Sequence, residues 1–490
     1  MKKLYSPWMM SLLVLPWLFP YAAGPSPWLP QWLCAAACAA LLWLGRATWS
    51  ADMVLRGWRW AAAISALMGL VQYLGGSSSM APWISVTSAG EAYANLRQRN
   101  QYATLTSIGL AATLWLAACQ RDRDANPRWL DLAFAVLLAA GNAASSSRTG
   151  ALQLLLLTLL AGLWGLWRHV AVRRLLLAAG LTYLTALLVL PVMIGQPSEE
   201  VGMLARLREG ETVCGSRYPL WTNVLHLIGL RPWLGWGWGE LDYAHFITPY
   251  PGERFCEMLD NAHNLPLHLA VELGLPVTLL ILALVTRWVW RRQPWREMDA
   301  VRQAAWAVIA LLALHSMFEY PLWYGPFQLA LGLGLSLLIV RRTPAGKTDA
   351  GTGRRDLLLV TSICLLLGYL AWDYHRISQI YLPAEQRAAA YREDPWRHAR
   401  DSWVFRKQVD FAEYSVTPLT PANALMLHDM GETLLHYSPE ARVVEKLIES
   451  ATLLGRGEEA AFYLERFRAA YPKDYARWSD RARAVGVGPD

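Results

Sequence analysis

The chain has 490 residues, of which 54% are hydrophobic and only 17% charged, and the apolar residues fall in long blocks rather than at amphipathic spacing. Such blocks are typical of polytopic membrane proteins. The net charge of +7 does not indicate nucleic-acid binding, because the basic residues form short clusters between the blocks instead of one stripe. The 26 tryptophans, many near block ends, fit interfacial aromatic belts.

The apolar blocks predict an all-α membrane protein with about eleven transmembrane helices. The first block follows Lys2 and Lys3, and we interpret it as an uncleaved first helix. We expect a transmembrane domain over 1–372, with a long loop at 196–263, and a C-terminal helical domain over 373–490. The predicted spans are 8–22, 28–45, 58–74, 101–119, 129–143, 150–167, 175–195, 264–286, 302–320, 322–340 and 356–372.

Arginine is unevenly distributed among the loops. Connections on the side of the N-terminus carry most of the basic residues, so the positive-inside rule places that side in the cytoplasm. The long loop and the C-terminal domain would then face the periplasm. Arginines on the outer side are candidates for anion binding, although long translocated loops also tolerate charge. They are Arg97, Arg99, Arg148, Arg206, Arg208, Arg217, Arg231 and Arg254.

The polar tail contains two helical stretches, 441–454 and 458–470, separated by a glycine break at 455–457 and followed by Pro472. This spacing is reminiscent of one tetratricopeptide unit. The long loop contains two cysteines, Cys214 and Cys256, in a compartment predicted to be oxidising. We therefore predict a disulfide that closes the loop.

Two polar clusters lie at the outer ends of the fourth, fifth and sixth predicted helices. Gln98, Arg99 and Asn100 crowd one boundary, and a serine-rich turn before Arg148 lies at the other. Their guanidinium, amide and hydroxyl groups suit phosphate or sugar oxygens, so we predict that they bind substrate. The alternatives are an interfacial cap whose side chains snorkel to water and a turn that caps the next helix.

The long loop carries a second basic and aromatic stretch. It begins at Arg217 and continues into the Gly/Trp-rich segment 231–239. Tryptophan faces stack on sugar rings and also sit among lipid headgroups, and glycine permits close backbone approach. The segment therefore fits a glycolipid boundary, or an interfacial re-entrant loop without substrate contact.

Histidines mark two further outer boundaries. His263 and Asn264 open the eighth predicted helix, where His268 and Glu272 follow at helical spacing. Imidazole suits general-base chemistry near neutral pH, so His263 is the predicted base. The turn after the ninth helix gathers a similar set of polar side chains. We predict that these side chains, together with Asn264, bind substrate: His315, Glu319, Tyr320 and Tyr324. No ligand spacing indicates a metal site, and no glycine-rich loop indicates a nucleotide.

These motifs, written QRNQ, SSSRTG, NAHNLPLHLAVELG and HSMFEYPLWY in this chain, resemble those of the O-antigen ligase and polymerase superfamily. The EYPLWY stretch and the tail look most like bacterial PglL-type O-oligosaccharyltransferases. That resemblance implies en bloc transfer of an oligosaccharide from undecaprenyl pyrophosphate to serine or threonine of exported proteins such as pilin, without a metal or other cofactor. It also implies that His263 and Arg217 are catalytic, and that Gln98, Asn100, Arg148 and the Tyr320/Tyr324 region bind substrate.

Three enzyme activities share such a site and differ only in the acceptor. They are protein O-glycosylation, ligation of O-antigen to lipid A-core, and polymerisation of repeat units. A glycolipid transporter or flippase is an alternative of another class, but it predicts internal repeats and ionisable pairs near the bilayer midplane. The sequence shows no clear repeats.

Overall fold

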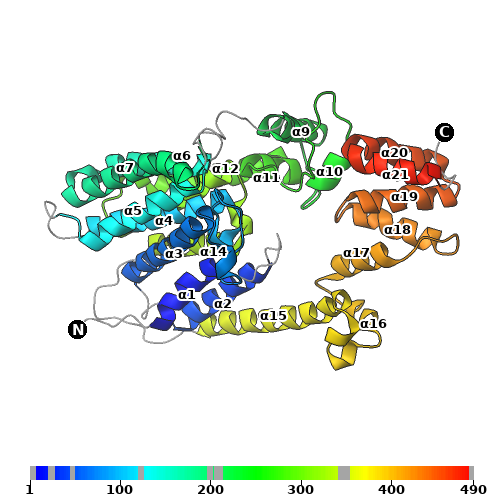
Figure 1. Cartoon of the computed structure of the whole chain (residues 1–490), viewed down its shortest axis with the longest axis horizontal. Helices are drawn as coiled ribbons and strands as arrows, with labels where there is room; N and C mark the ends of the chain where they lie inside the picture. Colours follow the sequence, from blue (N-terminus) through cyan, green and yellow to red (C-terminus); the bar gives the residue numbers. More distant parts are fainter. Residues whose placement is uncertain are drawn as a thin grey trace. The chain divides into compact units, whose positions relative to one another are not determined.

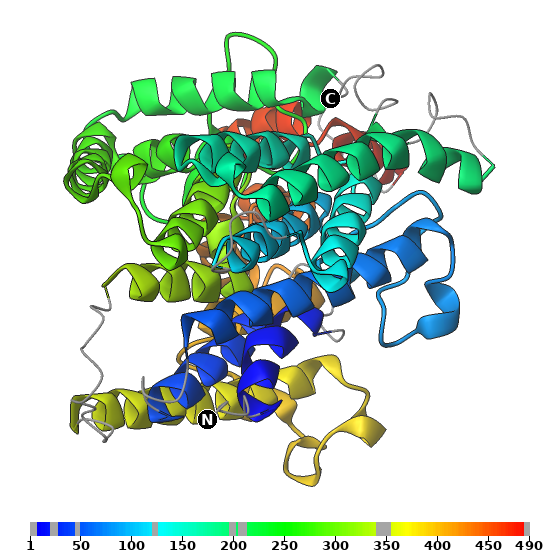
Figure 2. The ribbon, with the colours of Figure 1, turned by 90° about the vertical axis from the view of Figure 1, so that its left-hand side faces the viewer.

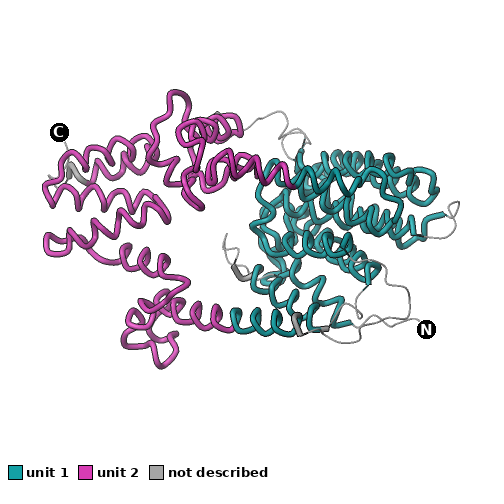
Figure 3. The backbone as a smooth tube through the Cα atoms, turned by 180° about the vertical axis from the view of Figure 1, so that it is seen from behind, with its two compact units in different colours: residues 1–210, 285–367 teal, residues 211–284, 368–490 magenta. Residues whose placement is uncertain are grey.

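The computed structural model describes residues 7–19, 28–44, 50–119, 126–195, 202–203, 213–339 and 354–484, and these residues form helices and no β-strand. The all-α prediction is therefore confirmed for the described part of the chain. Lys2, Lys3, Arg206 and Arg208 lie outside it. The chain divides into two compact units, residues 1–210 with 285–367 and residues 211–284 with 368–490 (Figure 3).

The first unit is a helical bundle of apolar helices (Figure 1). The strongest packing in the bundle joins α3 to α4 and α5 to α7, and α13 packs on α4 and α14. Figure 2 shows the same helices from a second side. The helices are α1 (Pro7–Leu18), α2 (Trp28–Leu44), α3 (Ala51–Tyr73), α4 (Arg99–Ala118), α5 (Trp129–Ala144), α6 (Arg148–Leu163), α7 (Val170–Met193), α13 (Ala300–Ser316) and α14 (Gly325–Ile339).

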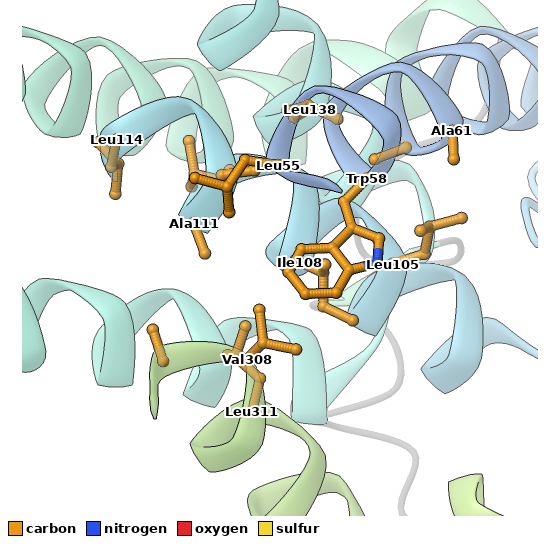
Figure 4. Close-up of a cluster of buried hydrophobic side chains, with 14 of the residues drawn as sticks. Leu55, Trp58, Ala61, Leu105, Ile108, Ala111, Leu114, Leu138, Val308 and Leu311 are labelled. Atoms are coloured by element: carbon orange, nitrogen blue, oxygen red, sulfur yellow. The ribbon is translucent and has the colours of Figure 1, made fainter. Parts of the chain in front are cut away.

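The centre of this bundle is α4, whose side chains are almost all buried. Trp58 of α3 lies against Leu105 and Ile108 of α4, and Val308 and Leu311 of α13 face the same cluster from another side (Figure 4). Alanines and glycines fill the closest approaches between helices, as expected where backbones pack tightly. A rigid α4 fixes the position of the polar residues at its beginning.

Polar side chains fasten the segment between α3 and α4. The buried amide of Gln72 donates to the backbone oxygens of Ser85 and Ala94, at 2.8 and 2.9 Å, and accepts from two backbone N–H groups. Asn95 donates to the oxygens of Leu18 and Trp83, both at 2.9 Å. These amides satisfy backbone groups that have no partner in a helix or sheet, so the segment has a fixed path into α4.

The second unit combines the region after residue 211 with the tail. Its first part contains α9 (Arg217–Leu230), α10 (Leu241–Ile247) and α11 (Leu265–Leu273). The predicted eighth span is broken at Gly274, because α11 ends at Leu273 and α12 (Leu275–Arg292) begins after the glycine. The tail contains α16 (Pro395–Ala399), α17 (Arg406–Val416), α18 (Ala424–Leu435), α19 (Ala441–Leu453), α20 (Gly457–Ala470) and α21 (Pro472–Ala484).

Helix α10 packs into the tail. Phe246 is almost fully buried in the hydrophobic cluster formed mainly by α18, α19 and α20. Nearby, Glu240 Oε2 lies 2.6 Å from His436 Nδ1, and Arg466 Nε donates to the backbone oxygen of Ile247 at 2.9 Å. The predicted boundary at 372/373 remains a prediction, but within this unit the loop and the tail share one core.

A helix lies at each of the eleven predicted apolar blocks, and α15 (Arg354–Ser378) accounts for the last. By length and composition, Val170–Met193 and Asp356–Tyr381 can each cross a membrane. Six shorter helices are also apolar. The number of crossings and their orientation stay predictions. The two predicted tail helices are confirmed as α19 and α20.

Candidate functional site

The predicted site residues divide between the two units. The first unit contains the amide and arginine cluster of α4, the serine-rich turn before α6 and the turn after α13. The second unit contains Arg217, His263 and Asn264. We describe each group within its own unit.

A hydrogen-bond network centred on Glu319 joins three of the predicted motifs in the first unit. The Glu319 carboxylate is buried and accepts from Gln98 Nε2 at 3.2 Å and from Asn100 Nδ2 at 2.9 Å. The other amide atom of Asn100, Oδ1, accepts from Ser147 Oγ at 2.6 Å. Gln98, Asn100 and Glu319 were predicted site residues, and the structure brings them into contact.

Local sequence explains why these side chains converge. Gln98 is the N-cap of α4 and Asn100 lies in its first turn, while Ser147 caps α6 by accepting from Gly150 N at 3.1 Å. Glu319 follows the end of α13, and its backbone N–H donates to the oxygen of His315 at 2.9 Å. Three helix ends thus meet. Ser147 belongs to the serine-rich turn, for which substrate binding and capping of the next helix were both predicted, and the structure shows the cap.

The arginines of this cluster have different surroundings. Arg99 forms an ion pair with Glu91, with Nη2 and Oε1 2.5 Å apart. Arg97 is exposed and has a φ of +58°, in the left-handed region that side chains other than glycine rarely adopt. The pairing of Arg99 with a carboxylate of the same segment gives it a structural role. Its predicted contact with substrate stays a prediction.

His315 lies beneath the network rather than at its surface. It is fully buried, and its Nδ1 is 2.9 Å from Thr104 Oγ1. That hydroxyl donates to the Asn100 backbone oxygen at 2.9 Å and accepts from Gln153 Nε2 at 2.9 Å. A hydroxyl has one proton, so Nδ1 must be the donor to Thr104. His315 therefore supports the first turn of α4 from inside, and its predicted contact with substrate remains a prediction.

The remaining predicted residues of this unit flank the network in sequence. Arg148 is half-buried and is the first residue of α6, where the helix dipole favours negative charge. Tyr320 and Tyr324 stack with ring centroids 5.9 Å apart, beside the short 3₁₀ turn Pro321–Trp323. The backbone of that turn is held by Gln31, which donates to the Trp323 oxygen at 2.6 Å. These groups offer a cation, phenols and a helix N-terminus.

In the second unit, His263 occupies a strained backbone position. Its φ is +48°, and its N–H donates to Asn261 Oδ1 at 2.9 Å. Asn264 is the N-cap of α11 and accepts from Leu267 N at 3.1 Å. Left-handed conformations at residues other than glycine cost free energy and cluster at functional sites. The half-buried imidazole is therefore fixed at a helix start by its own backbone.

A carboxylate accompanies this histidine. Burial raises the pKa of Asp260, and the nearby charge of His263 opposes that rise. Trp221 of α9 donates its indole N–H to the Ala262 oxygen at 3.1 Å, which ties α9 to the same turn. Asp260 lies three positions before His263 in the sequence, but it was not selected as a site residue because the segment has no periodicity. Its carboxyl lies close enough to the imidazole for the two charges to interact.

Arg217 begins α9, directly after the only disulfide among the described residues. Cys214 and Cys256 are joined, with Cα atoms 5.3 Å apart, and Cys256 N donates to the Cys214 oxygen at 3.2 Å. Asn223 also attaches α9 to a later part of the loop. Its Nδ2 donates to the Glu253 oxygen at 2.9 Å, and its Oδ1 accepts from Phe255 N at 2.8 Å. The start and the middle of α9 are therefore held, and Arg217 has a defined position.

The Gly/Trp-rich segment packs on α11 through its glycines. Gly235 and Gly274 have φ values of +70° and +81°, and an added Cβ at either would lie 2.3–2.4 Å from backbone atoms of the other segment. The backbone N–H of Trp236 donates to the Val271 oxygen at 2.8 Å, and Glu272 Oε1 accepts from Gly239 N at 3.0 Å. The glycines thus serve backbone packing. Trp233 and Trp238 remain exposed, as an interfacial or sugar-binding role requires.

Asp242 of α10 gives this unit a pH-dependent stability. Burial raises the pKa of its carboxyl from 3.8 to about 7, helped by the charges of Glu240 and Asp260. The folded state then retains a proton that the unfolded chain loses. This proton raises the free energy of unfolding by at most about 4 kcal/mol. The stabilisation is fully present below pH 3.8 and is lost as the pH rises to about 7.

We therefore expect Asp242→Asn to raise the unfolding temperature more at pH 8 than at pH 4. The measurement is thermal unfolding of the purified chain followed by tryptophan fluorescence between pH 4 and 8, with Asp429→Asn, at an exposed position of α18, as the control. A difference between Asp242→Asn and the natural chain that is the same at every pH would contradict the assignment.

Three family models match successive parts of the chain. Residues 92–117 match the model described as protein glycosylation ligase, and residues 133–282 match O-antigen ligase. Residues 303–485 match the C-terminal region of a virulence factor membrane-bound polymerase. The first match contains Gln98 and Asn100, the second contains Arg217 and His263, and the third contains Glu319.

Two curated proteins of Acinetobacter baylyi are similar to the chain. A ComP-specific O-oligosaccharyltransferase is 24% identical over 370 residues, covering 73% of this chain and 64% of the relative. A general O-oligosaccharyltransferase is 25% identical over 349 residues, covering 67% and 57%. The matched region is therefore less than two thirds of either relative, and no solved structure matches. Together, these similarities place the chain in the O-antigen ligase and polymerase superfamily, beside the PglL-type O-oligosaccharyltransferases.

Proposed function

We propose that this protein is a glycosyltransferase of the bacterial inner membrane. It moves an oligosaccharide en bloc from undecaprenyl pyrophosphate to a serine or threonine hydroxyl of exported proteins such as pilin, on the periplasmic side. The names of the two relatives support transfer of oligosaccharide to protein. The apolar helices and the description of one matched family as membrane-bound support the location.

The network around Glu319 is the observation that carries this proposal. Its members come from the three segments that match three different glycan-assembly families: Gln98 and Asn100 from the first, Ser147 from the second and Glu319 from the third. Amides held by a buried carboxylate present their remaining donors and acceptors in one fixed geometry. Such preorganisation suits recognition of a glycan or a pyrophosphate.

The proposed reaction is a displacement at the anomeric carbon. The acceptor hydroxyl oxygen forms a bond to that carbon while the bond from the carbon to the pyrophosphate oxygen breaks. His263 accepts the hydroxyl proton, and Asp260 stabilises the imidazolium that forms. Arg217, in the same unit as His263, balances the charge of the departing undecaprenyl pyrophosphate. An in-line displacement inverts the anomeric configuration, and no metal or nucleotide takes part.

The other activities differ in acceptor and product. O-antigen ligation would place the glycan on lipid A-core, and polymerisation would lengthen the lipid-linked glycan. A glycolipid transporter would form no new glycosidic bond. The protein acceptor is favoured by the two O-oligosaccharyltransferases, which are similar over 73% and 67% of this chain.

The experiment is expression in a strain that makes undecaprenyl-pyrophosphate-linked oligosaccharide, lacks its own ligase and carries a pilin. Intact-mass spectrometry of pilin and electrophoresis of lipopolysaccharide are compared with an empty-vector strain. We expect one glycan mass added to pilin. Glycan on lipid A-core alone, or only a longer lipid-linked glycan, would replace the proposal with the ligase or polymerase activity. No new product in any fraction would contradict the enzyme assignment.

A further inference from the structure

We propose that the C-terminal helices hold a divalent transition-metal ion, with Zn²⁺ as the best fit, between His428, Glu432 and Glu459. His428 and Glu432 lie one turn apart on α18, and Glu459 lies in the first turn of α20. One nitrogen or carboxylate oxygen from each residue lies within 4.8 Å of the others. This inference does not depend on the transferase activity.

The orientation of His428 is the first step. The ring is fully buried, and its Nδ1 lies 3.2 Å from Ser450 Oγ of α19. That hydroxyl donates its proton to the Leu447 backbone oxygen at 2.9 Å. Because serine has one hydroxyl proton, His428 Nδ1 must be the donor to Ser450. In the neutral ring, the lone pair is then on Nε2. This is the arrangement of metal-bound histidines, whose second nitrogen donates to a neighbouring group.

The second step is what Nε2 faces. Nε2 lies 3.1 Å from Glu459 Oε1, so a lone pair and a carboxylate oxygen point at each other. Such a contact is repulsive unless a positive charge lies between them, which is either a second ring proton or a cation. With metal–ligand distances of about 2.0–2.2 Å, two atoms at this separation subtend roughly 95° at the ion. That angle suits neighbouring ligands of one metal.

The ligand set selects the class of ion. One imidazole nitrogen with two carboxylates suits Zn²⁺ and its neighbours in the first transition row better than Ca²⁺, which prefers oxygen alone. Arg456 Nη1 lies 3.5 Å from Glu459 Oε2, so the guanidinium contacts one carboxylate oxygen while Oε1 faces the histidine. Glu432 is exposed, which gives the ion an entry path and leaves room for water.

The position of the cluster gives the ion a structural task. Helices α18 and α20 both pack on α19, and the ion would join them to each other directly. Bound metal would therefore stabilise the core that also receives Phe246 of α10.

The test uses the full chain without a polyhistidine tag, purified in detergent, treated with chelator and titrated with Zn²⁺ against a fluorescent competitor. We expect one equivalent to bind and the unfolding temperature to rise. Glu459→Gln and Glu432→Gln should each weaken binding more than about tenfold. Glu458→Gln, an exposed neighbour with the same charge change, should bind as the natural chain does.

Two results would overturn the site. One is the absence of saturable Zn²⁺ binding by the natural chain, which would leave a ring proton as the charge between Nε2 and the carboxylate. The other is equal affinity of the Glu459→Gln and Glu458→Gln variants. His428→Gln should abolish the Co²⁺ absorption bands of the cobalt-loaded chain. If that core variant does not fold, the two glutamate variants decide, because their side chains are at least partly exposed.

Discussion

Replacing His263 by alanine is expected to reduce glycan transfer by 10²- to 10⁴-fold, the usual contribution of a general base. The imidazole lies at the start of α11, in a backbone conformation with a φ of +48°, near the carboxyl of Asp260. In the proposed mechanism, its removal leaves the acceptor hydroxyl without a proton acceptor. The measurement is initial rate of glycan addition to purified acceptor protein at saturating donor, per mole of folded enzyme.

A matched control separates chemistry from folding. His398→Ala removes a half-buried histidine from the tail, where it contacts the ring of Tyr391. It should leave the rate within about twofold, as expected for a site outside the reaction. If the His263→Ala chain elutes as the natural chain does, unfolds at the same temperature and keeps its full rate, the base is another group.

The Glu319→Ala substitution is expected to lower transfer about 100-fold, the effect of misplacing positioned groups by about 1 Å. Without the carboxylate, the amides of Gln98 and Asn100 lose their common acceptor, and the hold on Ser147 through Asn100 loosens. The transfer rate of the Glu319→Gln variant should lie between the rates of the natural chain and of Glu319→Ala. Its single amide oxygen can accept one donor, while its NH₂ group faces the other amide donor.

The control for this network is Glu297→Gln. Glu297 is a half-buried acid of the first unit, and it pairs with Arg302 at 2.7 Å. Its substitution should cost stability with no loss of rate per folded molecule. Rates are measured over a range of donor concentrations. A Glu319→Ala chain whose kcat and KM both match the natural values would remove the network from the site.

Apolar blocks located the helices because length and hydropathy are local properties of a segment. The break at Gly274 was not predicted, since it depends on Trp233 approaching that backbone from the other side of the loop. The glycines of 231–239 were also only partly understood from the sequence. They were predicted to permit close approach to their backbone, but the group that approaches is α11 and not a ligand.

The candidate site was likewise predictable from the sequence only in part. Residue type at a helix boundary was sufficient to select Gln98, Asn100 and Glu319, because polar groups at such positions need partners. Which partner each one has depends on helix packing, and the sequence does not contain that information in any local window. For the same reason, His428 and Glu432 could have been noticed at helical spacing on α18, but Glu459 comes from another helix.

The burial of Phe246 among the tail helices has a consequence for biosynthesis and for engineering. The loop leaves the ribosome well before the tail. The apolar face of α10 therefore stays exposed until α18, α19 and α20 have been synthesised and pack against it. Chimaeras that exchange only the tail between relatives would pair a foreign core with Phe246, Glu240 and the Ile247 backbone. A successful graft should carry residues 240–247 together with residues 424–471, as one cassette.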